Sequence, residues 1–256
     1  MHYWVGGSPQ NPLVMLTHGA TMDHAMFDPQ LEALLAEYRV LTWDVRGHGE
    51  SRPLQGEFTL NDAVGDLVAI LDEVGSEKAV LVGQSMGGYI SQYTYLNHPE
   101  RVQAIVIIGS TSIALPYSRW EIIALKASAP LFGLWPYGHF KKTIARSTAI
   151  KPDVQRYAFE TVSKLSRQEF LKIWKAVTFA VNAQGIPGHY INVPLLLTHG
   201  DQDRTGVIRR DAPKWAAYEP DVQYVVIPDA GHNANQDNPE FFNRVLLDFL
   251  RQRVAS

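Results

Sequence analysis

Six short apolar runs are spread along the chain, and each has the length of a buried strand. They cover residues 13–16, 39–43, 79–82, 104–108, 193–198 and 222–227. Amphipathic stretches separate most of them. Because buried strands that alternate with helices are typical of a parallel sheet with helices on its faces, the pattern predicts an α/β fold with a mostly parallel, doubly wound sheet.

Three of the intervening stretches have the marks of helices. The first, over residues 59–74, can be capped by Thr59, with Asp62 three residues later. Its apolar stripe consists of Leu60, Val64, Leu67, Leu71 and Val74. The second is expected over residues 86–97 and the third over about residues 239–253. The inward face of the third is predicted to consist of Phe241, Val245, Leu246 and Leu250.

Strand-like runs are missing between residues 111 and 190, and this stretch has the pattern of helices alone. Residues 166–169 read Ser-Arg-Gln-Glu, which is a capping box. Apolar residues follow at helical spacing, namely Phe170, Ile173, Trp174, Val177 and Val181. Pro152 fits the first turn of an earlier helix. We therefore expect a core domain made of residues 1–110 and 191–256, with residues 111–190 inserted as a helical cap.

Composition excludes several classes of protein. With 46% hydrophobic and 19% charged residues, the 256-residue chain can bury a full core and is not of the disordered class. A net charge of −3 gives no basic field for nucleic acid. We expect no membrane partner, because no apolar run approaches the roughly 20 residues of a spanning helix. No signal peptide is visible, and zero Cys excludes disulfides and a Cys nucleophile, so a cytoplasmic protein is expected.

The most informative motif is Gly-Gln-Ser-Met-Gly-Gly over residues 83–88, between a predicted strand and a predicted helix. Gly-x-Ser-x-Gly occurs by chance, but a sharp strand-to-helix turn is the context in which it presents a serine nucleophile. Glycines are needed there because larger side chains would collide with the neighbouring strand and helix. The helix N-terminus supplies free N–H groups and the positive end of its dipole. We interpret Ser85 as a nucleophile rather than as the cap of an ordinary turn.

A serine hydroxyl is a poor nucleophile at neutral pH and needs a base that a third group orients. His232 follows the last predicted strand, which places it at the carboxyl edge of the sheet together with Ser85. Asp201 and Asp203 both follow the strand that ends near Thr198, and they compete for the third role. We favour Asp203 because it lies further into the loop, whereas Asp201 suits turn hydrogen bonds.

Acyl transfer usually needs two N–H donors for the oxyanion of its tetrahedral intermediate. The natural pair is the backbone N–H of Met86, next to the nucleophile, and that of Ala20, after the first long strand. We interpret His18 as a structural hydrogen-bonding residue. The polar loop over residues 44–51 is interpreted as held by an Asp–Arg interaction rather than as catalytic.

Neither a metal site nor a phosphate-binding loop is indicated. The nine His residues form no His-x-x-x-His or His-Glu-x-x-His pattern. The glycine-rich residues 83–88 lack a Lys-Ser/Thr ending and do not have Gly-x-Gly-x-x-Gly spacing.

Five motifs occur in a fixed order along the chain. They are His18-Gly19, Asp44-x-Arg46-Gly47-His48-Gly49-x-Ser51, Gly83-Gln84-Ser85-Met86-Gly87-Gly88, His199-Gly200-x-x-Asp203 and Gly231-His232. In these motifs the sequence resembles the α/β-hydrolase superfamily, and within it carboxylesterases, enol-lactonases and cofactor-free haloperoxidases. The resemblance covers most of the chain outside the cap. It implies a Ser85–His232–Asp203 triad, an oxyanion hole from Ala20 and Met86, and a mechanism without a cofactor.

The resemblance also implies the substrate, a small carboxylic ester or lactone cleaved through an acyl-enzyme. Ser85 argues against haloalkane dehalogenases and epoxide hydrolases, which use Asp at this position. Only 17 residues precede His18, which leaves room for one N-terminal strand where the family often has two. Either the sheet has seven strands instead of eight, or the true start lies upstream. The stretch after Asp203 lacks the Pro that the family often carries nearby.

Aromatic residues are abundant in the predicted cap, especially over residues 131–137. Some of them must pack the cap onto the core. The excess predicts an apolar or aromatic pocket for a small substrate, with Phe132, Trp135 and Tyr137 as substrate-binding residues. Carbon–carbon bond hydrolysis, perhydrolysis or haloperoxidation on the same triad, or a slow ligand receptor, are the alternatives, because one fold hosts many chemistries. A homo-oligomer is compatible with the sequence.

Overall fold

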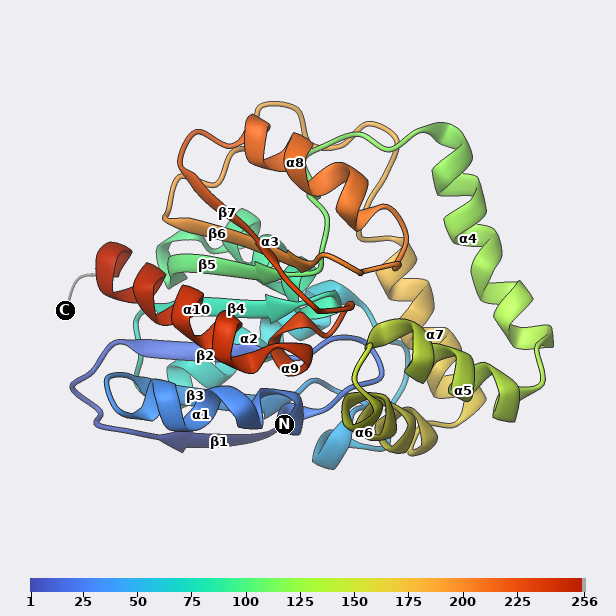
Figure 1. The fold of residues 1–256 in the computed structure, drawn as a ribbon, viewed down its shortest axis with the longest axis horizontal. Helices are drawn as coiled ribbons and strands as arrows, with labels where there is room; N and C mark the ends of the chain where they lie inside the picture. The colour runs from blue at the N-terminus through green and yellow to red at the C-terminus, as the bar shows by residue number, and fades with distance from the viewer. Residues whose placement is uncertain (255–256) are drawn as a thin grey trace.

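The computed structural model describes residues 1–254, which fold around one sheet of seven strands (Figure 1). The strands are β1 (His2–Gly6), β2 (Leu13–Thr17), β3 (Arg39–Asp44), β4 (Ala79–Gln84), β5 (Val102–Ile108), β6 (Leu195–Gly200) and β7 (Val222–Ile227). Their order across the sheet is β1-β3-β2-β4-β5-β6-β7. Only the edge strand β1 is antiparallel to its neighbour. The predicted mostly parallel sheet and its seven strands are confirmed.

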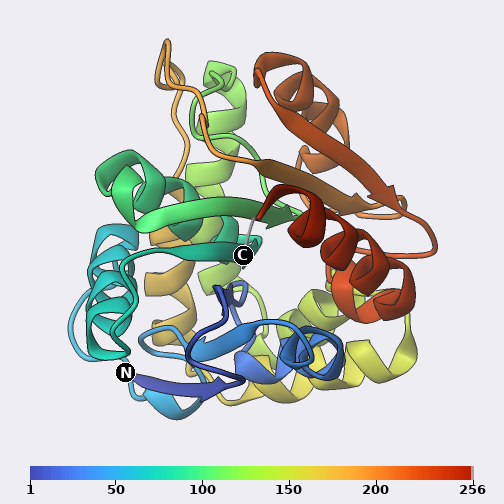
Figure 2. The same cartoon turned by 90° about the vertical axis from the view of Figure 1, so that its left-hand side faces the viewer.

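Ten α-helices occur in the described part of the chain. They are α1 (Asp28–Leu35), α2 (Leu60–Glu73), α3 (Met86–Asn97), α4 (Arg119–Leu134), α5 (Tyr137–Thr148), α6 (Pro152–Ser163), α7 (Arg167–Thr178), α8 (Ile208–Tyr218), α9 (Ala234–Asp237) and α10 (Pro239–Arg253). Helices α2, α3 and α8 cover one face of the sheet, and α1 and α10 cover the other. Figure 2 shows the twisted sheet between these two layers.

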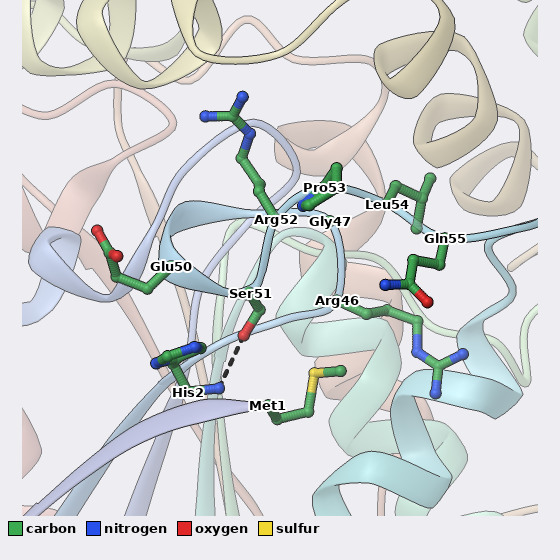
Figure 3. A pocket seen from close by; sticks show the side chains of 10 residues that line it. All are labelled: Met1, His2, Arg46, Gly47, Glu50, Ser51, Arg52, Pro53, Leu54 and Gln55. Carbon is green, nitrogen blue, oxygen red and sulfur yellow. Dashed lines mark hydrogen bonds between the residues drawn. The ribbon is translucent and has the colours of Figure 1, made fainter.

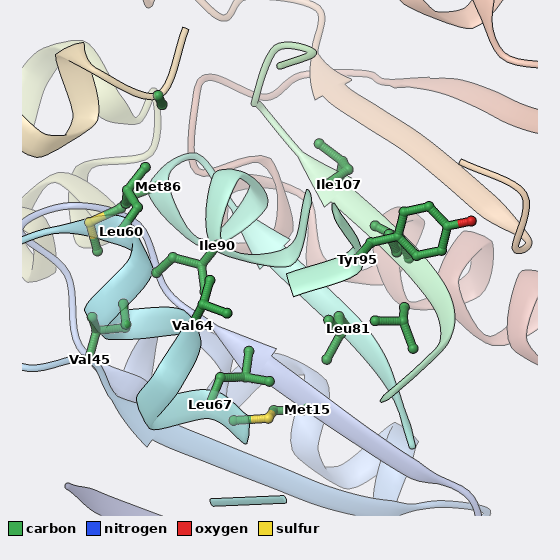
Figure 4. Close-up of a cluster of buried hydrophobic side chains, with 14 of the residues drawn as sticks. Met15, Val45, Leu60, Val64, Leu67, Leu81, Met86, Ile90, Tyr95 and Ile107 are labelled. Atoms are coloured by element: carbon green, nitrogen blue, oxygen red, sulfur yellow. The ribbon is translucent and has the colours of Figure 1, made fainter. Parts of the chain in front are cut away.

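The core consists of two clusters, one on each face of the sheet. Side chains alternate between them along each strand, as the pleat requires. In β4, Leu81 belongs to the cluster under α2 and α3, whereas Val80 and Val82 belong to the cluster under α1 and α10. Figure 4 shows the first cluster, in which Leu67 of α2 and Ile90 of α3 pack toward the strands.

Local capping explains where two of the predicted helices begin. The Thr59 hydroxyl accepts a hydrogen bond from the Asp62 N–H at 3.1 Å, at the start of α2. Ser166 and Glu169 form the expected capping box at the start of α7. Each of these interactions satisfies backbone donors that the first helical turn leaves free.

The predicted inward face of α10 is partly wrong. Phe242, Leu246, Phe249 and Leu250 are the buried residues, whereas Phe241 and Val245 are only half-buried. Apolar residues lie on two neighbouring faces of α10, so their spacing alone does not decide which face turns toward the sheet. The orientation is instead fixed by packing on the sheet.

Helices α4 to α7 all lie between β5 and β6 in sequence. Figure 1 shows them beyond the arrowheads of the parallel strands, over the carboxyl edge of the sheet. We call them the cap helices. Within residues 1–254, no helix combines the length and the hydrophobicity that crossing a membrane requires.

Candidate active site

Ser85 occupies the turn between β4 and α3, with φ 50° and ψ −109°. A positive φ is strained for a residue that has a side chain, and it persists only where the surroundings impose it. The backbone N–H of Ser85 donates to the carbonyl of Ile108 at 2.8 Å, which ties the turn to the end of β5. The sequence motif therefore folds as the sharp strand-to-helix turn that it predicts.

Two glycines make this turn sterically possible. A Cβ on Gly83 would lie 2.3 Å from the carbonyl oxygen of Gly87. A Cβ on Gly87 would lie 2.1 Å from the carbonyl oxygen of Thr17 in β2. Both distances are far below van der Waals contact, so helix α3 approaches the strands closely only because these positions lack side chains.

His232 and Asp203 form a buried pair on the loops that follow β7 and β6. His232 Nδ1 lies 2.9 Å from Asp203 Oδ2, and the Thr205 N–H donates to Asp203 Oδ1 at 2.8 Å. Burial by itself would raise the pKa of the Asp203 carboxyl, but the His232 ring and the Thr205 N–H more than offset it. The pKa of Asp203 is therefore lowered, and the group is an anion at neutral pH.

The other carboxylate of this loop has a different partner. Asp201 Oδ1 accepts a hydrogen bond from the Ala230 N–H at 3.1 Å, which joins the loops after β6 and β7. Of the two aspartates that the sequence offers, the structure thus brings Asp203 to His232, whereas Asp201 joins the two loops.

Several contacts bring the Ser85 turn and the His232 loop together. The side-chain amide of Gln84, the residue before Ser85, donates to the carbonyl of His232 at 3.1 Å. Gly109, with φ 57°, lies so close to both His232 and Asp203 that an added Cβ would be 3.0 Å from His232 Nδ1. Within residues 1–254 the Ser85 hydroxyl makes no hydrogen bond to His232, and such bonds are often long before substrate is bound.

Ala20 lies beside the same turn. The sheet order reverses between β2 and β4, and Ala20 follows one of these strands while Ser85 follows the other. A Cβ on the neighbouring Gly19 would lie 3.3 Å from Ser85 Cβ. Among the described residues, the N–H groups of Ala20 and Met86 donate to no other group. Both donors are therefore available next to Ser85.

Two buried histidines near the site are structural. His18 Nε2 accepts from the Val45 N–H at 3.0 Å, and its Nδ1 lies 2.8 Å from the Gly19 carbonyl, which fixes a neutral tautomer. Burial lowers the pKa of His18. Burial, together with the neighbouring His18, lowers the pKa of His48 to about 3.

An Asp–Arg interaction holds the loop after β3, as expected, and its carboxylate comes from helix α2. Asp44 accepts hydrogen bonds from the backbone N–H groups of His24 and Glu50, each at 2.7 Å. Arg46 instead pairs with Asp66 of α2, at 2.6 and 2.7 Å. The partner of Arg46 therefore comes from outside the loop, while Asp44 binds backbone N–H groups.

A cavity of about 400 Å³ opens beside this loop. Figure 3 shows Arg46, Glu50 and Arg52 around it, with the His2 N–H donating to the Ser51 hydroxyl. None of Ser85, Asp203 and His232 lines this cavity.

The whole chain can now be compared with known proteins. The family model of the alpha/beta hydrolase fold matches residues 12–239. The chain belongs to this family. It is 25% identical over 248 residues to 3-oxoadipate enol-lactonase 1 of Acinetobacter baylyi, covering 96% of this chain and 91% of that protein. It is 24% identical over 249 residues to 2-(acetamidomethylene)succinate hydrolase of Mesorhizobium japonicum, covering 93% and 88%.

Solved structures show the same fold. A thermophilic esterase from Thermogutta terrifontis has a TM-score of 0.86 at 23% identity, covering 99% of this chain and 94% of that one. The enol-lactonase from Burkholderia xenovorans has a TM-score of 0.82 at 23% identity, covering 97% and 95%. The family and its relatives together support a hydrolase with the α/β-hydrolase fold.

In this α/β hydrolase a carboxylate that the sequence did not single out joins the cap to the His232 loop. Asp237 is buried and accepts from the Gly231 N–H at 2.8 Å and from the Lys151 N–H at 2.9 Å. Burial raises the pKa of Asp237 although these N–H groups oppose the rise. Lys164 also joins the cap to the core, because its Nζ lies 2.9 Å from Asp23 Oδ2.

The three aromatic residues predicted to bind substrate lie in a cluster within the cap of the hydrolase. Phe132 packs on Phe140 and Phe170, with ring centroids 5.0 and 6.2 Å apart. The Tyr137 hydroxyl donates to the Leu165 carbonyl at 2.9 Å, and the Trp135 ring lies 6.1 Å from that of Phe140. These contacts join cap helices, and substrate binding by the three residues stays a prediction.

Proposed function

We propose that the chain is a serine hydrolase that cleaves a small carboxylic ester or lactone through an acyl-enzyme. Ser85 is the nucleophile, His232 the general base and acid, and Asp203 the group that orients His232. The backbone N–H groups of Ala20 and Met86 form the oxyanion hole.

In this proposal a named residue carries out each step of the reaction. His232 Nε2 takes the Ser85 proton as the hydroxyl oxygen attacks the substrate carbonyl carbon. Asp203, an anion beside Nδ1, stabilises the imidazolium that forms. The carbonyl oxygen becomes negative and accepts hydrogen bonds from the Ala20 and Met86 N–H groups. His232 gives its proton to the leaving alcohol, and water then attacks the ester of Ser85 by the same route.

The observation that carries this proposal is the strained backbone of Ser85 at a helix N-terminus, opposite a buried His–Asp pair. A helix cap needs no positive φ, and a solvated loop histidine needs no buried carboxylate. The strained φ of Ser85 and the buried Asp203 carboxylate are both explained if a projecting nucleophile has to face an oriented base. The enol-lactonase and the esterase among the similar proteins support an ester or lactone substrate.

The proposal is tested with a series of p-nitrophenyl esters from acetyl to long acyl chains, with the Ser85→Ala variant as control. We expect turnover that depends on Ser85, with kcat reduced by at least about 10³-fold in the variant. The best chain length reports the size of the substrate pocket. Equal turnover by the variant and the wild type would contradict the role of Ser85.

A further inference from the structure

Helix α4 is covered on one side only. Figure 1 shows it as the outermost of the cap helices, and none of its 16 residues is buried. Its exposed apolar residues are Trp120, Ile123, Ala124, Ala127, Pro130, Leu131 and Leu134. Trp120 is 80% exposed, Leu131 62% and Leu134 83%. We call these seven residues the α4 face.

The α4 face is a continuous stripe. Most of its members are three or four positions apart, which places them on one side of a helix about 24 Å long. The outer side of a surface helix is normally polar, and the α4 face contains no charge. Phe179, also exposed, lies next to this helix, because Lys126 Nζ is 5.0 Å from its ring. Contiguous apolar surface of this kind indicates a binding partner.

The charge of the chain is strongly polarised between cap and core. Residues 111–190 contain eleven Lys or Arg and four Asp or Glu, a net charge of +7. The remaining residues contain twelve Lys or Arg and twenty-two Asp or Glu, a net charge of −10. A negatively charged surface would therefore attract the cap and repel the core, so that the cap approaches first.

Three exposed cations are close to the α4 face. Arg119 and Lys126 belong to α4, and Lys175 lies in the last turn of α7, beside Phe179. Within residues 1–254 none of them forms an ion pair, whereas the one acid on the helix, Glu121, is paired with Arg210. The charge left over around the apolar stripe is positive.

We propose that the α4 face docks on an anionic lipid surface, with α4 lying in the plane of the interface. An apolar stripe flanked by cations is what such a helix needs, and it requires no spanning segment. Trp120 and Trp135 mark the two ends of the helix, and indole rings favour the boundary between lipid and water. The sequence-based expectation of no membrane partner concerned spanning helices, and this proposal replaces it for the membrane surface.

A second copy of the chain fits the same face less well. Pairing two α4 faces would bring two caps together, each with a net charge of +7. The repulsion between them would oppose the gain from apolar contact, whereas anionic lipid supplies charge of the opposite sign.

The test is co-sedimentation of the full chain with vesicles. One set consists of phosphatidylcholine and the other of phosphatidylcholine with an equal part of phosphatidylglycerol. We expect binding to the anionic vesicles, weakening as salt is added, and a blue shift of tryptophan emission that is smaller in Trp120→Phe. The double variant Ile123→Glu/Leu131→Glu should bind more than about tenfold more weakly.

Val5→Glu/Val226→Glu is the matched control, because it places the same two charges on residues of the core that are about 40% exposed. It should bind like the wild type, and thermal melts of both variants show that they are folded. Absence of binding to anionic vesicles, or equal binding by both double variants, would overturn the proposal. A dimer that the Ile123→Glu/Leu131→Glu change abolishes, without any vesicle binding, would assign the α4 face to a second copy.

Discussion

The carboxyl edge of the sheet and the outer part of the cap, at α4, are packed in opposite ways. At the edge, Asp203 and His232 are buried and paired, and Gly83 and Gly87 sit where no Cβ could fit. In the cap, α4 has no buried residue, and Trp135 and Phe179 are partly in solvent.

This difference separates two tasks. Acyl transfer depends on reacting groups held within fractions of an ångström, and close packing supplies that precision. The exposed side chains of the cap can change without disturbing those groups. We therefore expect changes at the sheet edge to alter rate or folding strongly, and changes in the cap to alter substrate choice or surface binding.

The largest effect is expected at Asp203. Asp203→Asn removes the anion that orients His232 and should lower kcat by about 10³- to 10⁴-fold with KM little changed. Asp201→Asn is the matched control two residues away, and it should lose only stability, because Asp201 accepts from the Ala230 N–H and not from His232. The ester assay on both variants measures this. Equal losses of kcat would contradict the assignment of the third triad residue.

Alanine substitutions of two glycines, Gly87 at the sheet edge and Gly138 in the cap, test the difference in packing. Gly87→Ala forces a Cβ to 2.1 Å from the Thr17 carbonyl and should lower the free energy of unfolding by more than about 3 kcal/mol. Gly138→Ala, in α5, meets nothing within 4 Å and should raise it by up to about 1 kcal/mol. Urea unfolding of the two variants measures both values. A Gly87→Ala protein as stable as the wild type would show that the turn between β4 and α3 is not tightly packed.

The pH dependence of the free energy of unfolding tests how deeply His48 is buried near the sheet edge. The unfolded chain protonates an imidazole at its ordinary pKa of 6.5, but folded His48 does so only near pH 3. Below pH 6.5 the unfolded state binds more protons, so the free energy of unfolding falls as the pH falls, by about 1.4 kcal/mol per pH unit. His48→Gln should reduce this loss by about 2 kcal/mol between pH 6.5 and about pH 5. An unchanged slope would place His48 in a more solvated site.

The smallest effect on turnover is expected in the cap. Trp135→Ala should leave kcat/KM for acetyl esters within a few-fold and change the preference between long and short acyl chains by about tenfold. The ester series on wild type and variant measures that ratio. An unchanged ratio would leave Trp135 as a packing residue of the cap cluster and would count against its place in the substrate pocket.

The sequence predicted the sheet and the strand-to-helix turn at Ser85 well because both depend on local rules. A short, fully apolar run such as residues 79–82 is typical of a buried strand. The positive φ of Ser85 belongs to the sharp turn that Gly83 and Gly87 make sterically possible. Helices α1 and α8 were missed. Helix α1 is short and only weakly amphipathic. Helix α8 has three charges in its first four residues and carries Pro213, which a sequence pattern normally excludes from a helix interior.

Contacts between residues far apart in the chain could not be predicted from the sequence. Asp237 bonds backbone N–H groups of residues 150 and 151, and Arg46 reaches Asp66 on another element. No spacing rule joins positions so far apart. The exposure of the α4 face was also not predicted, since apolar positions at helical spacing normally imply burial.

The central claim is that Ser85 forms the acyl-enzyme with the help of His232. It is tested most directly by incubating the wild type, Ser85→Ala and His232→Ala with a fluorophosphonate and locating the adduct by peptide mass spectrometry. The account predicts one adduct on Ser85 of the wild type, none in Ser85→Ala, and labelling slowed by at least about 10³-fold in His232→Ala. Ester hydrolysis by the wild type with Ser85 unlabelled, or an adduct on another residue, would contradict it.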